Sequence, residues 1–294
     1  MTLRAAVLGH PISHSKSPAL HRAAYAQLGI ELAYDAIDVT EAALPAFMAG
    51  VRRDTSWRGL SVTMPLKAAM AAEVDEVRGV ARQLGVINTV AFERPGDPAG
   101  VPARLVGYNT DVAGIVNALR YAGAASEPSA VILGGGGTAA AAMAALKELG
   151  APKAAVYVRD IGRAAEARAA AAAVGLALQV LPLAAAAPAV TTADVVVSTL
   201  PPRAADGLAE ELAAAVGPNG NTVAGVLLDV AYDPWPSRIA AVWTDAGGRV
   251  VPGLEMLLYQ AVEQVRHFTG LEGPVPAEVI DVMCDAVGAP RRVF

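Results

Sequence analysis

The chain has 294 residues, a length at which a single hydrophobic core usually gives way to two domains. With 54% apolar and 17% charged residues it can bury large cores, which excludes a disordered protein. A net charge of −5 excludes a protein that grips a nucleic-acid backbone through a basic face, and the single cysteine excludes an internal disulfide.

Short apolar runs alternate with helical patterns along the first 110 residues, which is typical of an α/β protein with a mainly parallel sheet. In the first helix, Ser17 is the expected N-cap, Pro18 the first helical residue and Gly29 the end. Strands are predicted at residues 5–9, 32–39, 59–64, 86–92 and 103–107. Helices are predicted at residues 18–28, 41–53 and 65–83, and a proline- and glycine-rich surface turn at residues 93–100.

A second α/β series begins with a helix near Asp111. Its strands are predicted at residues 130–133, 154–158, 194–198, 226–230 and 249–251, and its helices at residues 139–149 and 162–174. After Gly253 two helical patterns remain, at residues 254–268 and 276–287, without strands of their own, so we expect them to return and cover the first domain. The predicted domains are residues 1–110 with 253–294, and residues 111–252.

Charges or prolines interrupt every apolar run of about 20 residues, so no membrane span is predicted. The apolar stretch at residues 5–9 is too short for a signal peptide, and Cys284 has no metal-ligand spacing around it. We therefore expect a cytoplasmic protein without a metal site that binds neither nucleic acid nor membrane. The pattern is compatible with a monomer or a homodimer.

A glycine-rich turn follows the strand at residues 130–133 and precedes a helix. This context is typical of a dinucleotide site, in which the first glycine makes the turn, the next admits the pyrophosphate and a small residue lets the helix pack. A plain glycine loop is the alternative. The candidate cofactor-binding residues of the turn are Gly134, Gly135, Gly136, Gly137, Thr138 and Ala139.

The end of the next strand indicates which dinucleotide binds. Val158 stands where an acidic residue would hold the ribose of NAD, and Arg159 follows it, with Arg163 four residues on. A guanidinium suits a 2′-phosphate, so NADP(H) is the predicted cofactor. Two solvated arginines are the alternative, and the charge of Asp160 would repel a phosphate unless its side chain turns away or caps the following helix.

Six further segments carry polar residues in a recognisable order. They are His-Pro-Ile-Ser-His-Ser-Lys-Ser-Pro at 10–18, Gly-Leu-Ser-Val-Thr-Met-Pro-Leu-Lys at 59–67, Ile-Asn-Thr at 87–89 with Asn-Thr-Asp at 109–111, Asp-Val-Ala-Tyr at 229–232, and Gly-Leu-Glu-Met-Leu-Leu-Tyr-Gln at 253–260. Together these segments resemble the shikimate dehydrogenase family, and they span nearly the whole chain. One departure is Ser61, where asparagine is the more usual residue of the family. Tyr108 is a second, since many relatives have an acid there.

The resemblance implies a role for single residues. Lys67 and Asp111 would be catalytic, as proton donor and orienting partner. The implied substrate-binding residues are Ser15, Ser17, Thr63, Asn88, Tyr232 and Gln260, and Gly253 would adjoin the cofactor. Taken singly, Ser17 and Asp111 are more simply helix caps and Lys67 a solvated helix start.

The implied fold is an N-terminal α/β substrate domain with a mainly parallel sheet plus a Rossmann-type doubly wound dinucleotide-binding domain, with a cleft between them. The implied function is the NADPH-dependent, reversible reduction of 3-dehydroshikimate to shikimate in the biosynthesis of aromatic amino acids through chorismate. An NAD-preferring quinate/shikimate dehydrogenase and a non-catalytic NADP-binding regulator are the alternatives.

Overall fold

The computed structural model describes residues 2–94, 103–216 and 222–291. Most of the turn predicted at residues 93–100 lies outside the described residues. The chain forms two compact units, unit 1 (Met1–Thr110 with Gln260–Phe294) and unit 2 (Asp111–Tyr259). The chain passes from unit 2 back to unit 1 inside one continuous helix, α10 (Gly253–Thr269). The sequence pattern instead predicts this domain boundary at the start of that helix.

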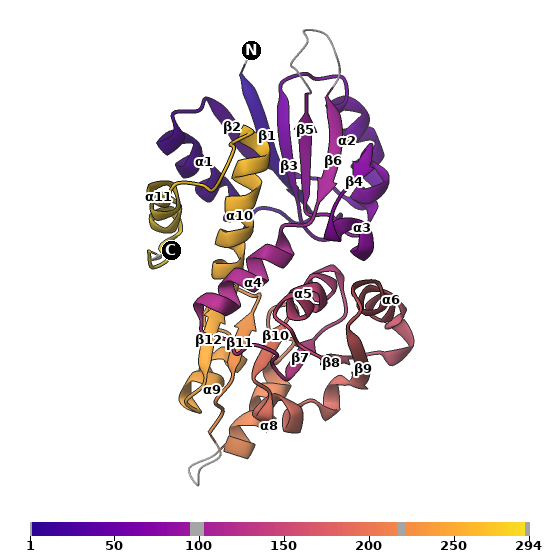
Figure 1. Ribbon diagram of the computed structural model, residues 1–294, viewed down its shortest axis with the longest axis vertical. Helices are drawn as coiled ribbons and strands as arrows, with labels where there is room; N and C mark the ends of the chain where they lie inside the picture. The colour runs from indigo at the N-terminus through magenta and orange to yellow at the C-terminus, as the bar shows by residue number, and fades with distance from the viewer. Residues whose placement is uncertain (1, 95–102, 217–221, 292–294) are drawn as a thin grey trace. The chain divides into compact units, whose positions relative to one another are not determined.

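Unit 1 contains a six-stranded sheet in the order β2-β1-β3-β5-β6-β4 (Figure 1). Its strands are β1 (Leu3–Gly9), β2 (Leu32–Asp38), β3 (Trp57–Val62), β4 (Glu76–Val77), β5 (Thr89–Glu93) and β6 (Arg104–Tyr108). Its helices are α1 (Ser17–Leu28), α2 (Leu44–Val51), α3 (Val80–Leu84), the second half of α10, and α11 (Ala277–Val287), with 3-10 turns η1 (Glu41–Ala43) and η2 (Ala69–Ala72). Helix α11 packs against α1, and the second half of α10 belongs to unit 1, whereas the sequence pattern assigns both C-terminal helices whole to the first domain.

Strand β5 runs antiparallel to both neighbours, while the other strands run parallel to one another. The amino end of β5 therefore lies beside the carboxyl ends of β3 and β6. The register places Thr89 opposite Ser61 on one side and Tyr108 on the other. One reversed strand thus adds a further set of polar residues to the edge of the sheet where parallel strands end.

The two faces of this sheet are covered by different helices, as strand alternation requires. Leu60 and Leu8 face a core that includes Met48 of α2 and Leu66. Gly59, one position before Leu60, faces α10, because a Cβ there would overlap the ring of Phe268. The alternation places Ser61 on the α10 face as well, and its hydroxyl reaches that helix.

The single helix predicted at residues 65–83 is wrong. The segment forms η2, the short strand β4 and α3. The amide of Asp75 donates to the carbonyl of Leu105 at 2.9 Å, and the carboxylate of Asp75 accepts from the amide of Leu105 at 2.8 Å. Gly79 adopts a positive φ of 58°, which an α-helix cannot contain. Pairing with β6 therefore overrides the helical pattern. The helix predicted at residues 41–53 is shortened to η1 and α2.

Unit 2 is built on a parallel sheet in the order β12-β11-β10-β7-β8-β9, which is the doubly wound order of the Rossmann fold. Its strands are β7 (Ala130–Leu133), β8 (Lys153–Val158), β9 (Ala177–Pro182), β10 (Val195–Ser198), β11 (Val226–Asp229) and β12 (Arg249–Pro252). Its helices are α4 (Asp111–Tyr121), α5 (Gly137–Glu148), α6 (Ala165–Val174), α7 (Ala187–Thr192), α8 (Asp206–Val216), α9 (Arg238–Asp245) and the first half of α10, with 3-10 turns η3 (Ile161–Arg163) and η4 (Leu183–Ala185).

The sequence pattern predicted neither β9 nor α7, α8 and α9. Strand β9 is at the edge of the sheet and has no buried residue, and Gln179 and Pro182 interrupt its apolar residues. Helices α7 and α8 are rich in alanine, which gives little contrast between a buried and an exposed face.

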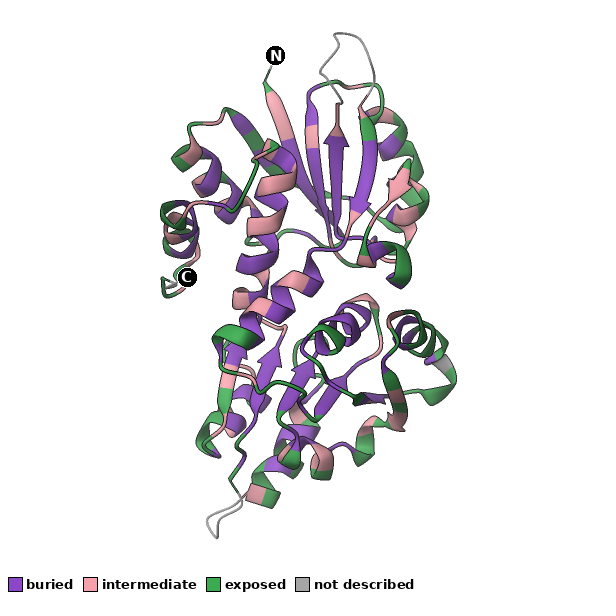
Figure 2. Ribbon diagram, in the orientation of Figure 1, coloured by how far each residue is buried: buried purple, intermediate pink, exposed green. Residues whose placement is uncertain are grey.

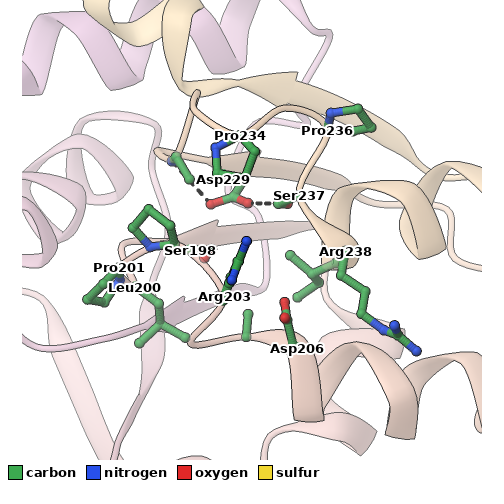
Figure 3. A pocket seen from close by; sticks show the side chains of 14 residues that line it. Ser198, Leu200, Pro201, Arg203, Asp206, Asp229, Pro234, Pro236, Ser237 and Arg238 are labelled. Atoms are coloured by element: carbon green, nitrogen blue, oxygen red, sulfur yellow. Dashed lines mark hydrogen bonds between the residues drawn. The ribbon is translucent and has the colours of Figure 1, made fainter. Parts of the chain in front are cut away.

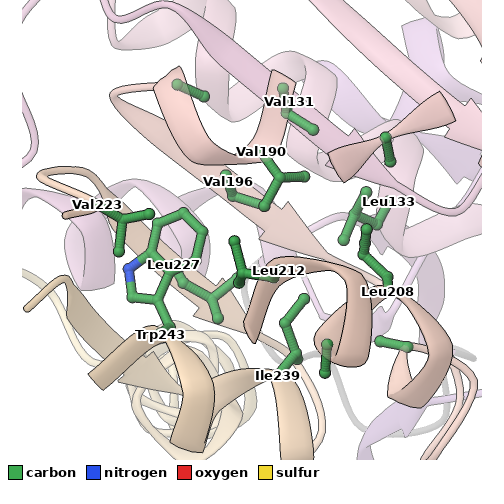
Figure 4. Packing of buried hydrophobic residues seen from close by; sticks show 14 of the residues in the cluster. Val131, Leu133, Val190, Val196, Leu208, Leu212, Val223, Leu227, Ile239 and Trp243 are labelled. Atoms are coloured by element: carbon green, nitrogen blue, oxygen red, sulfur yellow. The ribbon is translucent and has the colours of Figure 1, made fainter. Parts of the chain in front are cut away.

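Helices α7, α8 and α9 cover one face of this sheet through a shared apolar cluster (Figure 4). Trp243 of α9 is fully buried there, near Val223, Leu227 and Leu212. Its indole Nε1 donates to the carbonyl of Gly225 at 3.2 Å, so its polar atom is satisfied inside the core. Figure 2 shows that the strands of this sheet are mostly buried and that the outer faces of its helices are mostly exposed. Among the described residues, no helix combines the length and the apolar character needed to cross a bilayer.

Candidate functional site

Polar residues of unit 1 gather where β1 and β3 end and β5 begins. The amide of Thr63 donates to Leu8 at 2.9 Å, and the amide of Val62 donates to the carbonyl of Asn88 at 2.7 Å. The carbonyl of Lys67 accepts from the amide of Ile87 at 3.0 Å. Backbone hydrogen bonds therefore hold Thr63, Lys67 and Asn88 in one place, although 25 positions of sequence span them.

Asn88 is buried, and its side chain uses both of its polar atoms. Its amide nitrogen Nδ2 donates to Gln260 Oε1 at 2.9 Å and to Thr110 Oγ1 at 3.0 Å. Its oxygen Oδ1 accepts from the backbone amide of Thr110 at 2.7 Å. The turn that precedes Asp111, itself buried at the start of α4, is thereby tied to Asn88. Two predicted substrate-binding residues, Asn88 and Gln260, are thus brought together.

The two serines lie at the start of α1, but the prediction that Ser17 is the N-cap is wrong. The helix begins at Ser17 itself, and Lys16 precedes it without a side-chain cap. The hydroxyl of Ser15 accepts from the amide of Ser17 at 3.3 Å, which replaces the expected cap. Ser17 is buried and Ser15 is partly exposed. The predicted end of the helix is confirmed, because Gly29 adopts a φ of 66°.

Sequence reasoning missed a buried polar group around Gln264 of α10. Gln264 contacts Ser61 of β3, His21 of α1 and Thr89 of β5 through side-chain hydrogen bonds. The His21 ring stacks on Tyr34 of β2, with centroids 4.0 Å apart. One signal was present in the sequence: Gln264 follows Gln260 by four residues and so shares its helix face.

Burial lowers the pKa of His21 from its ordinary 6.5 to about 3, against a smaller opposing effect of its hydrogen bond to Gln264. The folded state keeps this ring neutral while the unfolded chain takes up a proton below pH 6.5. The stability that this difference contributes is therefore complete above that pH and declines as the pH falls from 6.5 towards 3, by at most about 1.4 kcal/mol per pH unit.

This pH dependence can be tested with His21→Gln, which does not titrate and keeps a donor for Gln264. Between pH 6.5 and 5, the wild-type free energy of unfolding should fall by about 1–2 kcal/mol more than that of the variant. Urea denaturation followed by circular dichroism measures both. Parallel pH curves for the two proteins would contradict the assignment of a neutral, buried His21.

Tyr108 belongs to an ionic cluster. Its hydroxyl donates to Glu93 at 2.7 Å and accepts from Arg78 at 3.0 Å, and its ring stacks on His267. Arg78 also donates to Glu76 at 2.7 Å, which lowers the pKa of that partly exposed carboxylate. Tyr108 thus anchors the end of β6.

The glycine-rich turn of unit 2 has the geometry that a dinucleotide phosphate needs. Gly134 adopts a φ of 103°, and a Cβ there would come within 2.5 Å of Thr199 Oγ1. A Cβ at Gly136 would meet nothing within 4 Å, so the turn is open at that point, and no side chain caps α5. Ala139 is fully buried where the helix meets the sheet. The residues present therefore fit a pyrophosphate bound by backbone amides.

Arg159 is exposed directly after β8, where it is free of the core. Asp160 caps η3 by accepting from the amide of Gly162 at 2.9 Å. The Asp160 carboxylate therefore takes the capping role that, according to the sequence analysis, allows a phosphate to bind near Arg159. Arg163 lies in η3, but its side chain is outside the described part of the chain.

A cavity of about 150 Å³ lies at the carboxyl ends of β10 and β11 (Figure 3). Asp229 lines it, accepting from Ser237 Oγ at 2.5 Å and from the amide of Ala231 at 3.3 Å, and burial raises the pKa of this carboxyl. These bonds hold both ends of the loop that carries Tyr232, whose phenol pKa is raised by burial. A Cβ at Gly253 would overlap the carbonyl of Val230, so the start of α10 packs directly on this loop.

A doubly wound parallel sheet with an open glycine turn after its first strand defines a dinucleotide-binding protein, here joined to a second α/β unit. Residues 7–90 match the shikimate dehydrogenase substrate binding domain, and residues 253–277 match the shikimate 5′-dehydrogenase C-terminal domain. The NADP(+) shikimate dehydrogenase of Rubrobacter xylanophilus is 38% identical over 280 residues, covering 92% of each chain.

Solved structures of shikimate dehydrogenases are similar to this chain as well. Shikimate dehydrogenase from Mycobacterium tuberculosis is 40% identical with a TM-score of 0.79, covering 97% of this chain and 99% of that one. Shikimate 5-dehydrogenase from Thermus thermophilus, in complex with NADP(H) and shikimate, is 34% identical with a TM-score of 0.76 and the same coverage. The chain belongs to the shikimate dehydrogenase family.

Proposed function

We propose that this chain catalyses the NADPH-dependent, reversible reduction of 3-dehydroshikimate to shikimate. The observation that carries the proposal is the linkage of Thr63, Lys67, Asn88 and Gln260 at one edge of the sheet of unit 1. These positions match the family's motif residue by residue, and unit 2 supplies the dinucleotide turn. Shikimate-dependent reduction of NADP(+), followed at the absorbance of the reduced nicotinamide, tests it directly, and no turnover would refute it.

The proposed chemistry divides between cofactor and protein. NADPH supplies the hydride when bound, and the protein supplies the proton that the developing alkoxide requires. We assign that proton to the ammonium group of Lys67, with the carboxylate of Asp111 as its orienting partner. In the reverse direction Lys67 accepts the proton from the shikimate hydroxyl.

Substrate recognition is proposed to use hydroxyl and amide groups. Ser15 and Ser17, at the start of α1, would bind the carboxylate of shikimate, because helix amides and hydroxyl donors together favour an anion. Thr63, Asn88 and Gln260 would pair the ring hydroxyls, and Tyr232 is the further substrate-binding residue that the family motif implies. A substrate that lacks a hydroxyl should then be strongly disfavoured, because a buried polar group would be left without its partner.

Arg159 is proposed to distinguish NADPH from NADH. Removing a charge-assisted hydrogen bond costs about 1.5–3 kcal/mol, so Arg159→Ala should raise the Kd for NADPH by roughly 10- to 100-fold. The Kd for NADH, which has no 2′-phosphate, should barely change. Fluorescence titration measures both constants. Arg168→Ala, which removes another exposed arginine from α6, is the matched control. Equal losses for both cofactors would contradict the assignment.

The alternatives are separated by the same assay. Faster turnover of quinate with NAD(+) would indicate a quinate/shikimate dehydrogenase, and binding of NADPH without turnover would indicate a regulator. A cytoplasmic location, and a monomeric or homodimeric state without nucleic acid or metal, complete the proposal. Sedimentation analysis tests the oligomeric state.

A further inference from the structure

We propose that Gln264 is a positioning residue for the Asn88–Thr89 segment, and that Ser61 extends its hydrogen-bond chain to Tyr34 of β2. This inference rests on the proposed function, because it assigns a purpose to a buried network that lies behind the proposed shikimate-binding residues. All of its members belong to unit 1.

Gln264 is 1% exposed and uses its full hydrogen-bonding capacity. Its oxygen Oε1 accepts from Ser61 Oγ at 2.8 Å and faces His21 Nε2 at 3.2 Å. Its nitrogen Nε2 donates to the carbonyl of Asn88 at 3.2 Å and to Thr89 Oγ1 at 3.0 Å. Two acceptor contacts and two donor contacts saturate a primary amide, so only this orientation of the amide fits.

The same contacts fix the direction of the neighbouring hydrogen bonds. The Thr89 hydroxyl accepts from Gln264 and donates to Asn88 Oδ1 at 2.9 Å. On the other side, Ser61 donates to Gln264 and accepts from the Tyr34 hydroxyl at 2.6 Å. The hydrogen bonds therefore run in one direction from Tyr34 through Ser61, Gln264 and Thr89 to the side chain of Asn88.

His21 completes this arrangement without adding charge. Because Gln264 Oε1 is an acceptor, His21 carries its proton on Nε2, and its Nδ1 accepts from the Tyr25 hydroxyl at 3.0 Å. Burial keeps the ring neutral by lowering its pKa to about 3. The network is thus a set of neutral, mutually satisfied groups, which rigidifies its surroundings.

Tyr34 of β2 begins this chain of hydrogen bonds. Its hydroxyl donates to Ser61 Oγ at 2.6 Å. Burial raises the pKa of Tyr34, and the side chains of Ser61 and Ser17 oppose that rise. The ordered hydrogen bonds therefore extend from Tyr34 to Asn88, and Ser61, a departure from the family pattern, is the residue that joins Tyr34 to Gln264.

The test is Gln264→Leu, which keeps the volume and removes every hydrogen bond of the amide. The KM for shikimate should rise by about 5- to 30-fold with a smaller change in kcat, while the KM for NADP(+) stays within about twofold. Thr269→Val on the same helix is the matched control, because it removes only a hydroxyl bonded to the backbone of Val265. The control should leave both constants unchanged.

A double-mutant cycle distinguishes positioning from a general loss of stability. If Gln264 acts through Thr89, Thr89→Val should raise the KM for shikimate by itself but add little to Gln264→Leu. Additive effects would overturn the proposal, as would a KM for shikimate that Gln264→Leu leaves within twofold. Should Gln264→Leu fail to fold, Ser61→Ala, which cuts the chain at one hydroxyl, must give the same rise on a smaller scale.

Amide hydrogen exchange keeps the inference separate from the proposed function. Exchange at residues 86–90, measured without substrate, should be several-fold faster in Gln264→Leu and unchanged in Thr269→Val. A wild-type chain that oxidises no shikimate would refute the proposed function, yet this exchange would still support Gln264 as the residue that holds the segment. Unchanged exchange together with an active wild type would refute the inference alone.

Discussion

Replacing Lys67 by methionine should lower kcat for shikimate oxidation by about 10²- to 10⁴-fold, because a positioned proton donor and acceptor is lost while the length of the side chain is kept. The Kd for NADPH should change by less than about threefold, since unit 2 carries the dinucleotide turn. Stopped-flow absorbance under single-turnover conditions measures the chemical step, and fluorescence titration measures cofactor binding.

The matched control is Lys153→Met, because Lys153 is exposed at the amino end of β8, the end opposite Arg159. It should retain full turnover. A Lys67→Met enzyme with turnover within tenfold of wild type would remove Lys67 from the chemistry. A loss confined to KM would instead indicate a substrate-binding role.

Replacing Trp243 by alanine should lower the free energy of unfolding by about 3–5 kcal/mol, the largest stability effect that we expect from one substitution. The indole is fully buried in the apolar cluster of unit 2, and its loss leaves a cavity there. It also leaves the carbonyl of Gly225 without the indole donor. Urea denaturation followed by far-ultraviolet circular dichroism measures the shift of the transition.

Trp235→Ala is the control for this substitution, because Trp235 is 39% exposed. Its effect on the free energy of unfolding should stay below about 1 kcal/mol. Similar losses for the two variants would show that burial of Trp243 does not dominate the stability of unit 2.

Much of the fold follows from local pattern. Central strands such as β7 and β10 are continuous apolar runs, and the glycine turn between such a strand and a helix indicates the dinucleotide-binding unit. Edge strand β9 and the alanine-rich helices escaped prediction because nothing in their composition separates a buried from an exposed face. The segment at 65–83 was mispredicted because pairing of β4 with β6 depends on residues some thirty positions away.

The sequence by itself determined the family, the Rossmann-type unit and the motif residues, because glycine turns, prolines and short polar segments can be recognised within a few consecutive residues. The tertiary structure alone decided that Ser15 rather than Ser17 accepts the first free amide of α1, and that β5 runs backwards. It also brought Gln264 onto Ser61, 203 positions away. A buried amide meets partners supplied by packing, and packing joins positions that no local pattern connects.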